Sequence, residues 1–368
     1  MSDLEYMKQA YALAEKGRGR TSPNPMVGAV VVKKGKIIGK GWHQRCGGPH
    51  AEMLALRQAG SSAQGAKLYV TLEPCFSFGR TPPCVDAVIR AGIKEVIVGM
   101  KDPNPKTNGR SLRKLRAAGV RVKTGFFEKE LQELNEVFVK YIRHKMPFVA
   151  TKTAQTLDGK IATVTGQSKW ITSAAARAYA HRMRGYVDAI MVGANTVRKD
   201  DPSLNAVPSS RPLKKIILDP NLSISPRARI FQGTLPENCI LAVSQKASSS
   251  KVKKFKRRGN QVIVAPGRKD YIGLRWLMRE LARQEIASVL IEGGSRVVGS
   301  ALREGIVDKM QIYLAPKIMG DERALSSVMG LKTPHLDQAV RLKNMTFKNV
   351  GGNILLAGDV VKNKHGKG

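Results

Sequence analysis

"AKLYVTLEPCFSFGRTPPCVDAVIRAG" (residues 66–92) joins a strand pattern, a loop with two cysteines and a helix pattern in one continuous run. The apolar residues before Glu73 are typical of a buried strand. The later apolar pattern is opened by prolines and closed by Gly92, as in a helix. Cys75 therefore follows the strand, and Cys84 lies at a helix N-terminus, where exposed N–H groups favour a thiolate. The order strand, loop, helix predicts an α/β fold.

The segments on either side continue this alternation. Residues 26–42 predict a hairpin that turns at Lys34-Gly35, and residues 50–60 predict a helix that ends at Gly60. A strand (94–100), a helix (109–119) and a last strand (120–125) follow Gly92. The pattern predicts a sheet with helices on both faces.

A second series of elements begins after residues 126–145, which have the pattern of one long helix ending before Pro147. A chain of 368 residues is long for a single core. We therefore expect two α/β domains, residues 1–146 and residues 147–368. The buried strand-like runs of the second domain are 147–155, 189–197, 214–220, 239–244, 261–266, 288–294 and 309–318.

The composition limits the partners and the compartment. Sixty-three Lys and Arg against 28 Asp and Glu give a net charge of +35, but the basic residues are spread along the chain. Aromatic residues, which would stack on bases, make up only 5% of the sequence, so we do not expect nucleic acid as a partner. No apolar run approaches the ~20 residues that span a membrane. Four irregularly spaced cysteines favour the reducing cytoplasm over secretion.

His50, Glu52, Cys75 and Cys84 form the first group of residues with chemical meaning. A catalytic zinc site needs three protein ligands and one open position, and His50, Cys75 and Cys84 supply that number. Glu52 can reach a water on the metal without binding the metal and can transfer its proton. A lone His-x-Glu or Pro-Cys pair is usually an ordinary buried turn. The combination matches the H-x-E…P-C-x-x-C pattern of zinc nucleobase deaminases, with the second cysteine nine residues after the first.

"PCFSFGRTPPC" (74–84) and "SPNPMVGAVVV" (22–32) resemble the deaminase half of the bifunctional enzyme family of bacterial riboflavin biosynthesis. The resemblance implies a cytidine-deaminase-like α/β/α domain with one zinc ion per chain. It also implies substrate contacts by Asn24, His43, Arg80 and Asn104. The family usually has a histidine where this chain has Ser77, so substrate affinity is expected to differ there.

Two stretches of the second half, residues 156–172 and 289–302, are weak signals when each is taken alone. The first is a turn after a strand. The second leads through Gly293-Gly294 into a helix, whose first N–H groups could bind an anion, but it lacks the G-x-G-x-x-G spacing. Together with "VGANTVRKDDPSL" (192–204) they resemble the reductase half of the same family. That resemblance implies a dihydrofolate-reductase-like α/β domain that uses NADPH.

The same resemblance assigns ligand contacts in the second half. NADPH contacts fall on Ala154, Trp170, Thr196, Asp200 and the turn formed by Gly294, Ser295, Arg296, Val297, Val298, Gly299 and Ser300. Substrate contacts fall on Ser168, Arg184, Leu204 and Glu292. Val207 stands where the family has an arginine. We therefore expect Arg184 to carry most of the phosphate binding, with Arg211 as a helper.

These resemblances lead us to expect a cytoplasmic, homo-oligomeric, bifunctional enzyme that acts on phosphorylated pyrimidines. It would deaminate 2,5-diamino-6-(5-phosphoribosylamino)pyrimidin-4(3H)-one. It would then use NADPH to reduce the ribosyl group of 5-amino-6-(5-phosphoribosylamino)uracil to ribityl. One alternative is a zinc-dependent tRNA adenosine deaminase with a basic, nucleic-acid-binding C-terminal half, which predicts C-x-x-C spacing and no reductase-like half. Another is a non-catalytic nucleic-acid-binding protein, which predicts loss of Glu52 or of a zinc ligand.

Overall fold

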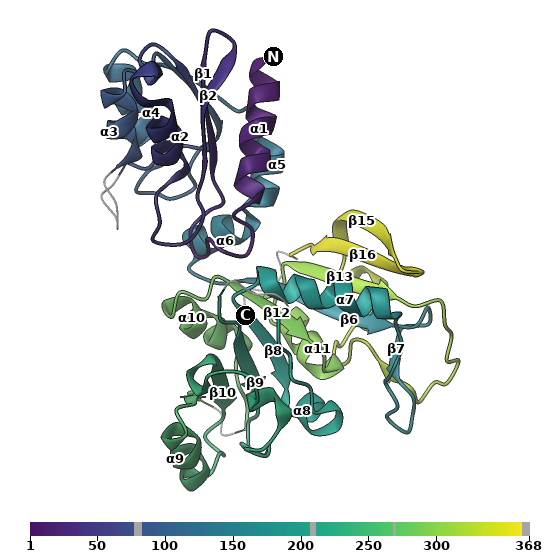
Figure 1. The fold of residues 1–368 in the computed structure, drawn as a ribbon. Helices are drawn as coiled ribbons and strands as arrows, with labels where there is room; N and C mark the ends of the chain where they lie inside the picture. The colour runs from purple at the N-terminus through teal and green to yellow at the C-terminus, as the bar shows by residue number, and fades with distance from the viewer. Residues whose placement is uncertain (77–82, 207–210, 268–269, 363–368) are drawn as a thin grey trace. The chain divides into compact units, whose positions relative to one another are not determined.

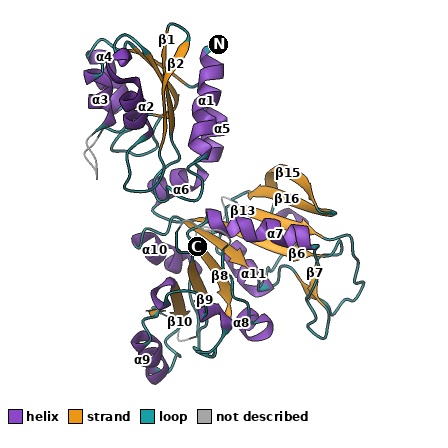
Figure 2. Cartoon of the chain, viewed as in Figure 1, coloured by secondary structure: helices purple, strands orange, loops and turns teal. Residues whose placement is uncertain are grey.

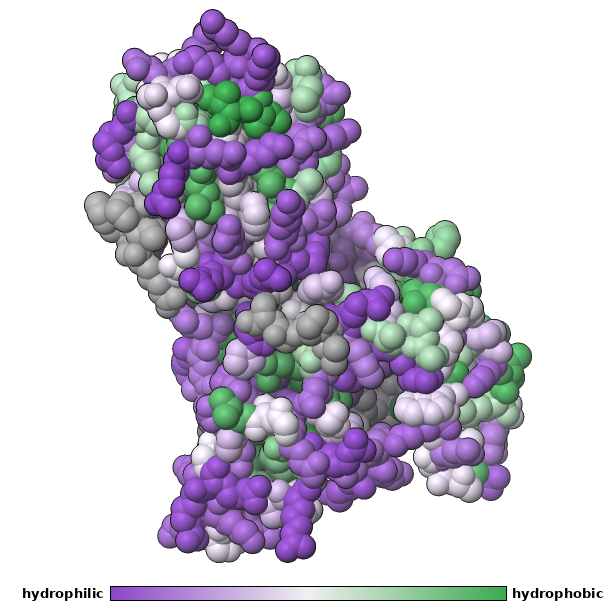
Figure 3. Space-filling view, in the orientation of Figure 1, coloured by the Kyte–Doolittle hydropathy of each residue, from purple (hydrophilic) through white to green (hydrophobic). Residues whose placement is uncertain are grey.

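The computed structural model describes residues 1–76, 83–206, 211–267 and 270–362. The chain forms two compact units, Met1–Met146 and Pro147–Gly368, and each has its own sheet and core (Figure 1). Within the described residues, none of the helices combines the length and the apolar composition that a bilayer crossing requires. On the face visible in Figure 3, hydrophilic residues predominate over both units.

The N-terminal unit is built on a five-stranded sheet with the order β2-β1-β3-β4-β5. β1 pairs antiparallel with β2 and β3, whereas β3, β4 and β5 are parallel. The predicted hairpin joins β1 to β2, and Lys34 and Gly35 have the positive φ angles, 47° and 75°, that its tight turn requires. The strands are β1 (Gly28–Lys33), β2 (Lys36–Trp42), β3 (Lys67–Leu72), β4 (Glu95–Met100) and β5 (Arg121–Thr124).

Helices cover both faces of this sheet, as the alternating pattern predicts. α1 and α5 lie on one face, and α2, α3 and α4 lie on the other (Figures 1 and 2). The core between them is apolar and fully buried at Val30, Leu68 and Ile97. The helices of this unit are α1 (Asp3–Glu15), α2 (Ala51–Ala59), η1 (Gly60–Ala63), α3 (Cys84–Arg90), α4 (Arg110–Ala117), α5 (Glu128–Leu134) and α6 (Glu136–His144).

The prediction of one long helix over residues 126–145 is wrong, because the segment is divided into α5 and α6 at Asn135. Asn135 is buried. Its side chain accepts a hydrogen bond from the Met26 N–H (2.8 Å) and donates one to the Met26 carbonyl (3.1 Å). Asn135 therefore holds the segment that leads into β1. This contact is long-range, so the local helical pattern gives no sign of it.

The C-terminal unit has a nine-stranded sheet with the order β11-β10-β9-β8-β12-β6-β13-β16-β15. β16 and β15 are antiparallel to their neighbours, and the other strands are parallel. The strands are β6 (Phe148–Gln155), β8 (Ala189–Gly193), β9 (Lys214–Leu218), β10 (Cys239–Val243), β11 (Gln261–Val264), β12 (Ser288–Glu292), β13 (Lys309–Leu314), β15 (Leu342–Val350) and β16 (Asn353–Val360). A separate short pair joins β7 (Lys160–Ala162) to β14 (Leu325–Ser326).

Two parallel strands of this unit, β8 and β12, lead into helices at their carboxyl ends. β8 runs directly into α8, and β12 passes through Gly293-Gly294 into α11. In sheets of this type ligands bind at the carboxyl ends of the strands, so this end of the sheet is the expected site. The helices are α7 (Ala174–Met183), η2 (Arg184–Tyr186), α8 (Ala194–Asp200), η3 (Arg229–Phe231), η4 (Pro236–Asn238), α9 (Ser249–Arg257), α10 (Leu274–Arg283), α11 (Ser295–Arg303) and η5 (Leu336–Gln338).

Candidate functional sites

The structure brings His50, Cys75 and Cys84 together in the N-terminal unit. His50 is the N-cap of α2, Cys75 follows β3, and Cys84 is the first residue of α3. Their ligand atoms all lie within 4.8 Å of one another. His50 Nδ1 is 3.2 Å from Cys84 Sγ and 3.6 Å from Cys75 Sγ. One nitrogen and two sulfurs at this spacing fit the three protein ligands of a catalytic zinc site.

The pKa values of the two cysteines also favour the binding of a cation. Hydrogen bonds to Cys75 Sγ from the Cys84 thiol, from His50 and from the Cys84 backbone N–H lower the pKa of Cys75 to about 4. The pKa of the Cys84 thiol is raised, because that thiol shares its proton with Cys75 and is buried. Cys75 is thus a thiolate, the form that binds metals. A divalent ion would displace the proton that Cys84 retains.

Glu52 lies beside these groups in the first turn of α2 and is 3% exposed. Burial and, to a smaller extent, the charge of Cys75 raise the pKa of Glu52 to about 7. A carboxyl group with such a pKa can both accept and return a proton near neutral pH. This is the property that the sequence-based role of Glu52 requires.

His43, a predicted substrate residue, lies against the predicted zinc ligand His50, and Asn24, a second predicted substrate residue, contacts His43. The His43 ring meets the His50 ring edge-on, with centroids 5.4 Å apart. Pro49 O is 3.1 Å from His43 Nδ1, and Asn24 Nδ2 is 3.3 Å from His43 Nε2. This arrangement fits a neutral histidine that donates from Nδ1 and accepts from the Asn24 amide at Nε2. Burial also lowers the pKa of His43, which favours the neutral form.

Asn104 lies in the loop that follows β4, the strand next to the one that delivers Cys75. Its backbone N–H donates to Asp102 Oδ1 (2.8 Å), and its Oδ1 accepts from the Lys106 N–H (3.1 Å). The loop is therefore closed by its own side chains. Arg80 and Ser77, the other residues that the sequence singles out here, lie outside the described residues.

Sequence reasoning missed Glu73, which ties the segment after β4 to the chain that leads into Cys75. Glu73 is 2% exposed and directly precedes Pro74-Cys75. Its carboxylate accepts hydrogen bonds from the Asp102 N–H (3.2 Å), the Gly109 N–H (2.9 Å) and the Ser111 hydroxyl (2.6 Å). A charged residue at the end of an otherwise apolar strand was the available signal.

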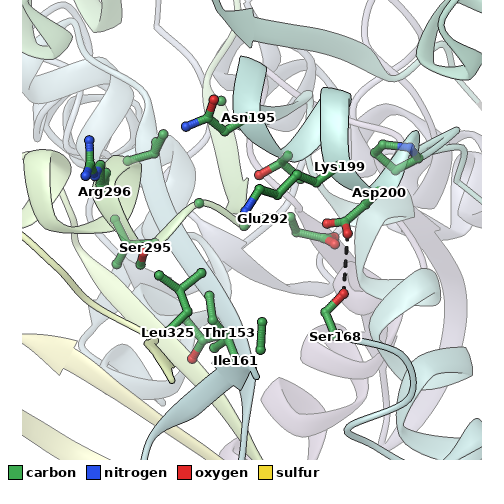
Figure 4. Close-up of a pocket in the computed structure, with 18 of the residues that line it drawn as sticks. Thr153, Ile161, Ser168, Asn195, Lys199, Asp200, Glu292, Ser295, Arg296 and Leu325 are labelled. Atoms are coloured by element: carbon green, nitrogen blue, oxygen red, sulfur yellow. Dashed lines mark hydrogen bonds between the residues drawn. The ribbon is translucent and has the colours of Figure 1, made fainter. Parts of the chain in front are cut away.

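The C-terminal unit contains a cavity of about 1150 Å³ at the carboxyl ends of its parallel strands (Figure 4). All the predicted NADPH and substrate residues of this unit line the cavity except Gly299 and the predicted phosphate helper Arg211. A Cβ at Gly299 would lie 1.8 Å from the Met329 carbonyl, so this glycine permits a close backbone approach instead. In Figure 4, Ser295 and Arg296 lie on one side of the cavity and Asp200 lies on the other.

Several of the predicted cofactor residues lie in or against the turn after β12. Gly293 and Gly294 have φ angles of +90° and +78°, a conformation that other residues rarely adopt. Thr196 of α8 packs against both glycines, and α11 begins at Ser295, which lines the cavity. Such a helix start suits the phosphates of a dinucleotide. Trp170 is 62% exposed and stacks with the Arg177 guanidinium 4.0 Å from its ring centroid, which leaves aromatic surface available to a ligand.

Two of the predicted substrate residues, Arg184 and Glu292, form a buried ion pair. Arg184 Nε and Nη2 donate to the two carboxylate oxygens of Glu292, each at 2.9 Å. Arg184 Nη1 donates to the Asn205 carbonyl (3.1 Å). Although burial raises it, Lys152 and Arg184 hold the pKa of Glu292 below its ordinary value. Ser168 donates to Asp200 Oδ1 (3.3 Å), as the dashed line in Figure 4 shows.

Lys152 was also missed by sequence reasoning. It lies on β6 with Nζ 3.9 Å from Glu292 Oε2, and it lines the cavity. A lysine inside an apolar strand was the available signal.

The structure does not support Arg211 as a helper at the phosphate. Arg211 Nη1 pairs with Asp188, which precedes β8 and accepts hydrogen bonds from the Ala287 and Ser288 N–H groups. This pair lies at the amino ends of β8 and β12, opposite to the ends that carry the cavity. Arg211 does not line the cavity, and Val207 lies outside the described residues.

Comparisons with known proteins place both units in context. A family model described as the RibD C-terminal domain matches residues 147–356. The model of the cytidine and deoxycytidylate deaminase zinc-binding region matches residues 1–100. Riboflavin biosynthesis protein RibD from Aquifex aeolicus is 45% identical over 356 residues, which cover 96% of this chain and 97% of that protein. The Escherichia coli protein of the same name is 38% identical over 97% of this chain and 99% of its own length.

Solved structures agree with these matches. RibD from Acinetobacter baumannii superposes with a TM-score of 0.87 at 35% identity and covers 98% of this chain and 99% of its own. The diaminohydroxyphosphoribosylaminopyrimidine deaminase/5-amino-6-(5-phosphoribosylamino)uracil reductase from Thermotoga maritima has a TM-score of 0.81 at 36% identity, with the same coverage.

Proposed function

The chain belongs to the RibD family of bifunctional riboflavin biosynthesis enzymes, and from this premise we propose which of its side chains perform the two reactions. It is a deaminase and a reductase, with a cytidine-deaminase-like and a dihydrofolate-reductase-like fold, and it uses zinc and NADPH. These conclusions confirm the sequence-based expectations of family, fold and cofactors. The alternative of a tRNA deaminase is not favoured, because the second half matches a reductase.

We assign the deaminase reaction to residues 1–146. The proposal rests on one observation: three ligand atoms lie within 4.8 Å of one another beside a buried carboxyl group. His50, Cys75 and Cys84 would hold the zinc, which supplies Lewis acidity that activates water for attack on an aminopyrimidine. Glu52 would accept a proton from the water and return it to the departing amine.

The pyrimidine would be 2,5-diamino-6-(5-phosphoribosylamino)pyrimidin-4(3H)-one. The hydrogen-bonded pair Asn24 and His43 would orient it at the zinc ligands, since His43 already contacts His50. Asn104, held in its loop by Asp102, and Arg80 would complete the contacts.

We assign the reductase reaction to residues 147–368. The observation that carries it is the cavity of about 1150 Å³ whose lining joins a helix start to a buried Arg184–Glu292 pair. NADPH supplies the hydride. Ala154, Trp170, Thr196, Asp200 and the turn at 294–300 would hold NADPH, and Ser168, Arg184, Leu204 and Glu292 would hold 5-amino-6-(5-phosphoribosylamino)uracil. The protein would contribute mainly the relative placement of the two ligands.

Arg184 still has donors for a phosphate. An arginine carries five N–H bonds. Arg184 uses one at Nε, one at Nη2 and one at Nη1 on Glu292 and Asn205, which leaves one on each Nη. Lys152 lies nearby, so the three charges of Lys152, Arg184 and Glu292 sum to +1 and favour an anion.

Phosphorylated pyrimidines are therefore the partners that we propose, and nucleic acid is not among them. We also propose a homo-oligomer in the cytoplasm. The four free cysteines support the reducing compartment.

Two separate assays test the assignment. Purified protein loaded with zinc should release ammonia from the diaminopyrimidinone in the absence of NADPH. It should oxidise NADPH when it is given the deaminated uracil derivative. If either product fails to form at any protein concentration, the proposal for that domain is wrong.

A further inference from the structure

Lys215 is a lysine buried inside the reductase unit. It lies on β9 and is 2% exposed. Its ammonium group donates to the Ser203 carbonyl (2.6 Å), to Asn205 Oδ1 (2.8 Å) and to the Ile230 carbonyl (2.9 Å). An ammonium group has three hydrogens, so these three acceptors satisfy all of them.

These partners are unusual because they are neutral. Lys215 forms no ion pair with any carboxylate in the part of the chain that the structure describes, and burial lowers its pKa. Transfer of a charge from water into a protein interior is costly, and an apolar residue of the same size would be a less costly occupant. Stability alone therefore does not account for a lysine here.

The three hydrogen bonds converge on a loop that lines the cavity. Leu204 is 6% exposed, lines the cavity and has a φ of +53°, a left-handed conformation that is unfavourable for leucine. Lys215 binds the residue before Leu204 and the residue after it, and so holds that conformation from both sides. The Asn205 carbonyl in turn accepts from Arg184 Nη1.

We propose that Lys215 is a positioning residue of the reductase, which fixes Leu204 and Asn205 so that Leu204 and Arg184 face the phosphoribosyl substrate. Lys215 does not line the cavity, so it acts through these residues and not by contact with the ligands. The inference rests on the proposed substrate contacts of Leu204 and Arg184.

Lys215→Met tests it, because methionine has a similar length and lacks the charge and the donors. The matched control is Lys214→Met on the same strand. Lys214 is half-buried, points to the opposite face and donates to the Glu237 carbonyl (3.2 Å). In Lys215→Met we expect the KM for 5-amino-6-(5-phosphoribosylamino)uracil to rise ~10-fold, or ~1.4 kcal/mol. The KM for NADPH and the deaminase activity of the same chain should change less than about twofold. Lys214→Met should resemble wild type.

The KM distinguishes positioning from a loss of folded protein. An unfolded fraction lowers the amount of active enzyme and thus the apparent kcat, but it leaves KM unchanged. A fall in kcat alone, or an equal rise of both KM values, would overturn the inference.

If Lys215→Met does not fold, Asn205→Ala decides the question, because Asn205 is exposed and the change removes only one acceptor of Lys215. We expect a ~3-fold rise in substrate KM for the loss of one such bond, and an unchanged KM would overturn the inference. Wild-type protein that does not oxidise NADPH with this substrate would instead disprove the proposed function itself.

Discussion

In the N-terminal unit three ligand atoms lie within 4.8 Å of one another, whereas the cavity of the C-terminal unit takes its lining from residues 152–327. The residues of the first site follow one strand and begin two helices, and the most distant of them in sequence, His50 and Cys84, are 34 residues apart. The second is assembled from several strand ends, a glycine turn and the β7–β14 pair. One site depends on a few atoms, and the other on many.

This difference has consequences for catalysis. Removal of one group from the compact site removes a ligand or the proton carrier, and no neighbour can replace it. In the cavity each residue contributes one of many contacts, so single changes should give graded losses in binding. The expected effect of a single change on catalysis therefore falls from the compact site to the cavity.

The largest effect should follow loss of a zinc ligand. Cys75→Ser or Cys84→Ser should lower the zinc content from about one ion per chain to nearly none and abolish ammonia release. NADPH oxidation with the deaminated substrate should persist. Cys46→Ser, four residues before His50, is the matched control and should retain zinc, as metal analysis can show. Full zinc in both ligand variants would show that the ligand assignment is wrong.

Glu52→Gln should have the next largest effect. The amide keeps the size of the buried side chain but cannot transfer the proton, so ammonia release should fall at least ~100-fold, the usual scale of general acid–base catalysis. Zinc and NADPH oxidation should be retained. Retention of rapid deamination would show that another group carries the proton. Loss of both activities would show that the two domains are not chemically independent.

The compact site could be predicted from the sequence because its evidence is local. His50, Glu52, Cys75 and Cys84 stand in a short stretch with spacings that few other sites share, and the strand and helix signals place them. The residues whose roles depend on distant contacts could not be predicted. Asn135 divides α5 from α6 through Met26, and the buried Lys215 is satisfied by atoms of residues 203, 205 and 230.

The terminal hairpin of β15 and β16 was also missed, for a related reason. β15 is exposed along most of its length, so its sequence, with Lys343, Thr346 and Lys348, lacks a buried stripe. Its place is set by pairing with β16, which in turn pairs with β13. A strand that is defined by its partner leaves little periodic signal.

Arg184→Ala tests the substrate end of the cavity and should have a smaller effect than the zinc-site changes. We expect the KM for the phosphorylated uracil to rise ~10-fold or more, since a hydrogen bond to a charged group contributes ~1.5–3 kcal/mol. The KM for NADPH should hardly change. Arg184→Lys, which keeps the charge but not the planar fork, should recover only part of the loss. If the general field of the +35 chain binds the phosphate instead, substrate KM should climb steeply with salt in wild type and variant alike.

Arg211→Ala should have the smallest effect on catalysis. It tests whether Arg211 binds the phosphate, as the sequence suggested, or only pairs with Asp188, as the structure shows. Arg211 follows the position where the family has its arginine, which suggested a role at the phosphate, but it pairs with Asp188 at the opposite end of the strands. Loss of Arg211 removes the cation that pairs with the buried Asp188, which keeps its hydrogen bonds from Ala287 and Ser288, so the free energy of unfolding should fall by about 2 kcal/mol. Denaturant unfolding measures this loss, with the exposed Arg257→Ala as control.

Both reductase KM values should stay at wild-type levels, because a change at the amino ends of β8 and β12 leaves the Arg184–Glu292 pair intact. A rise in substrate KM without a loss of stability would show that Arg211 binds the phosphate after all.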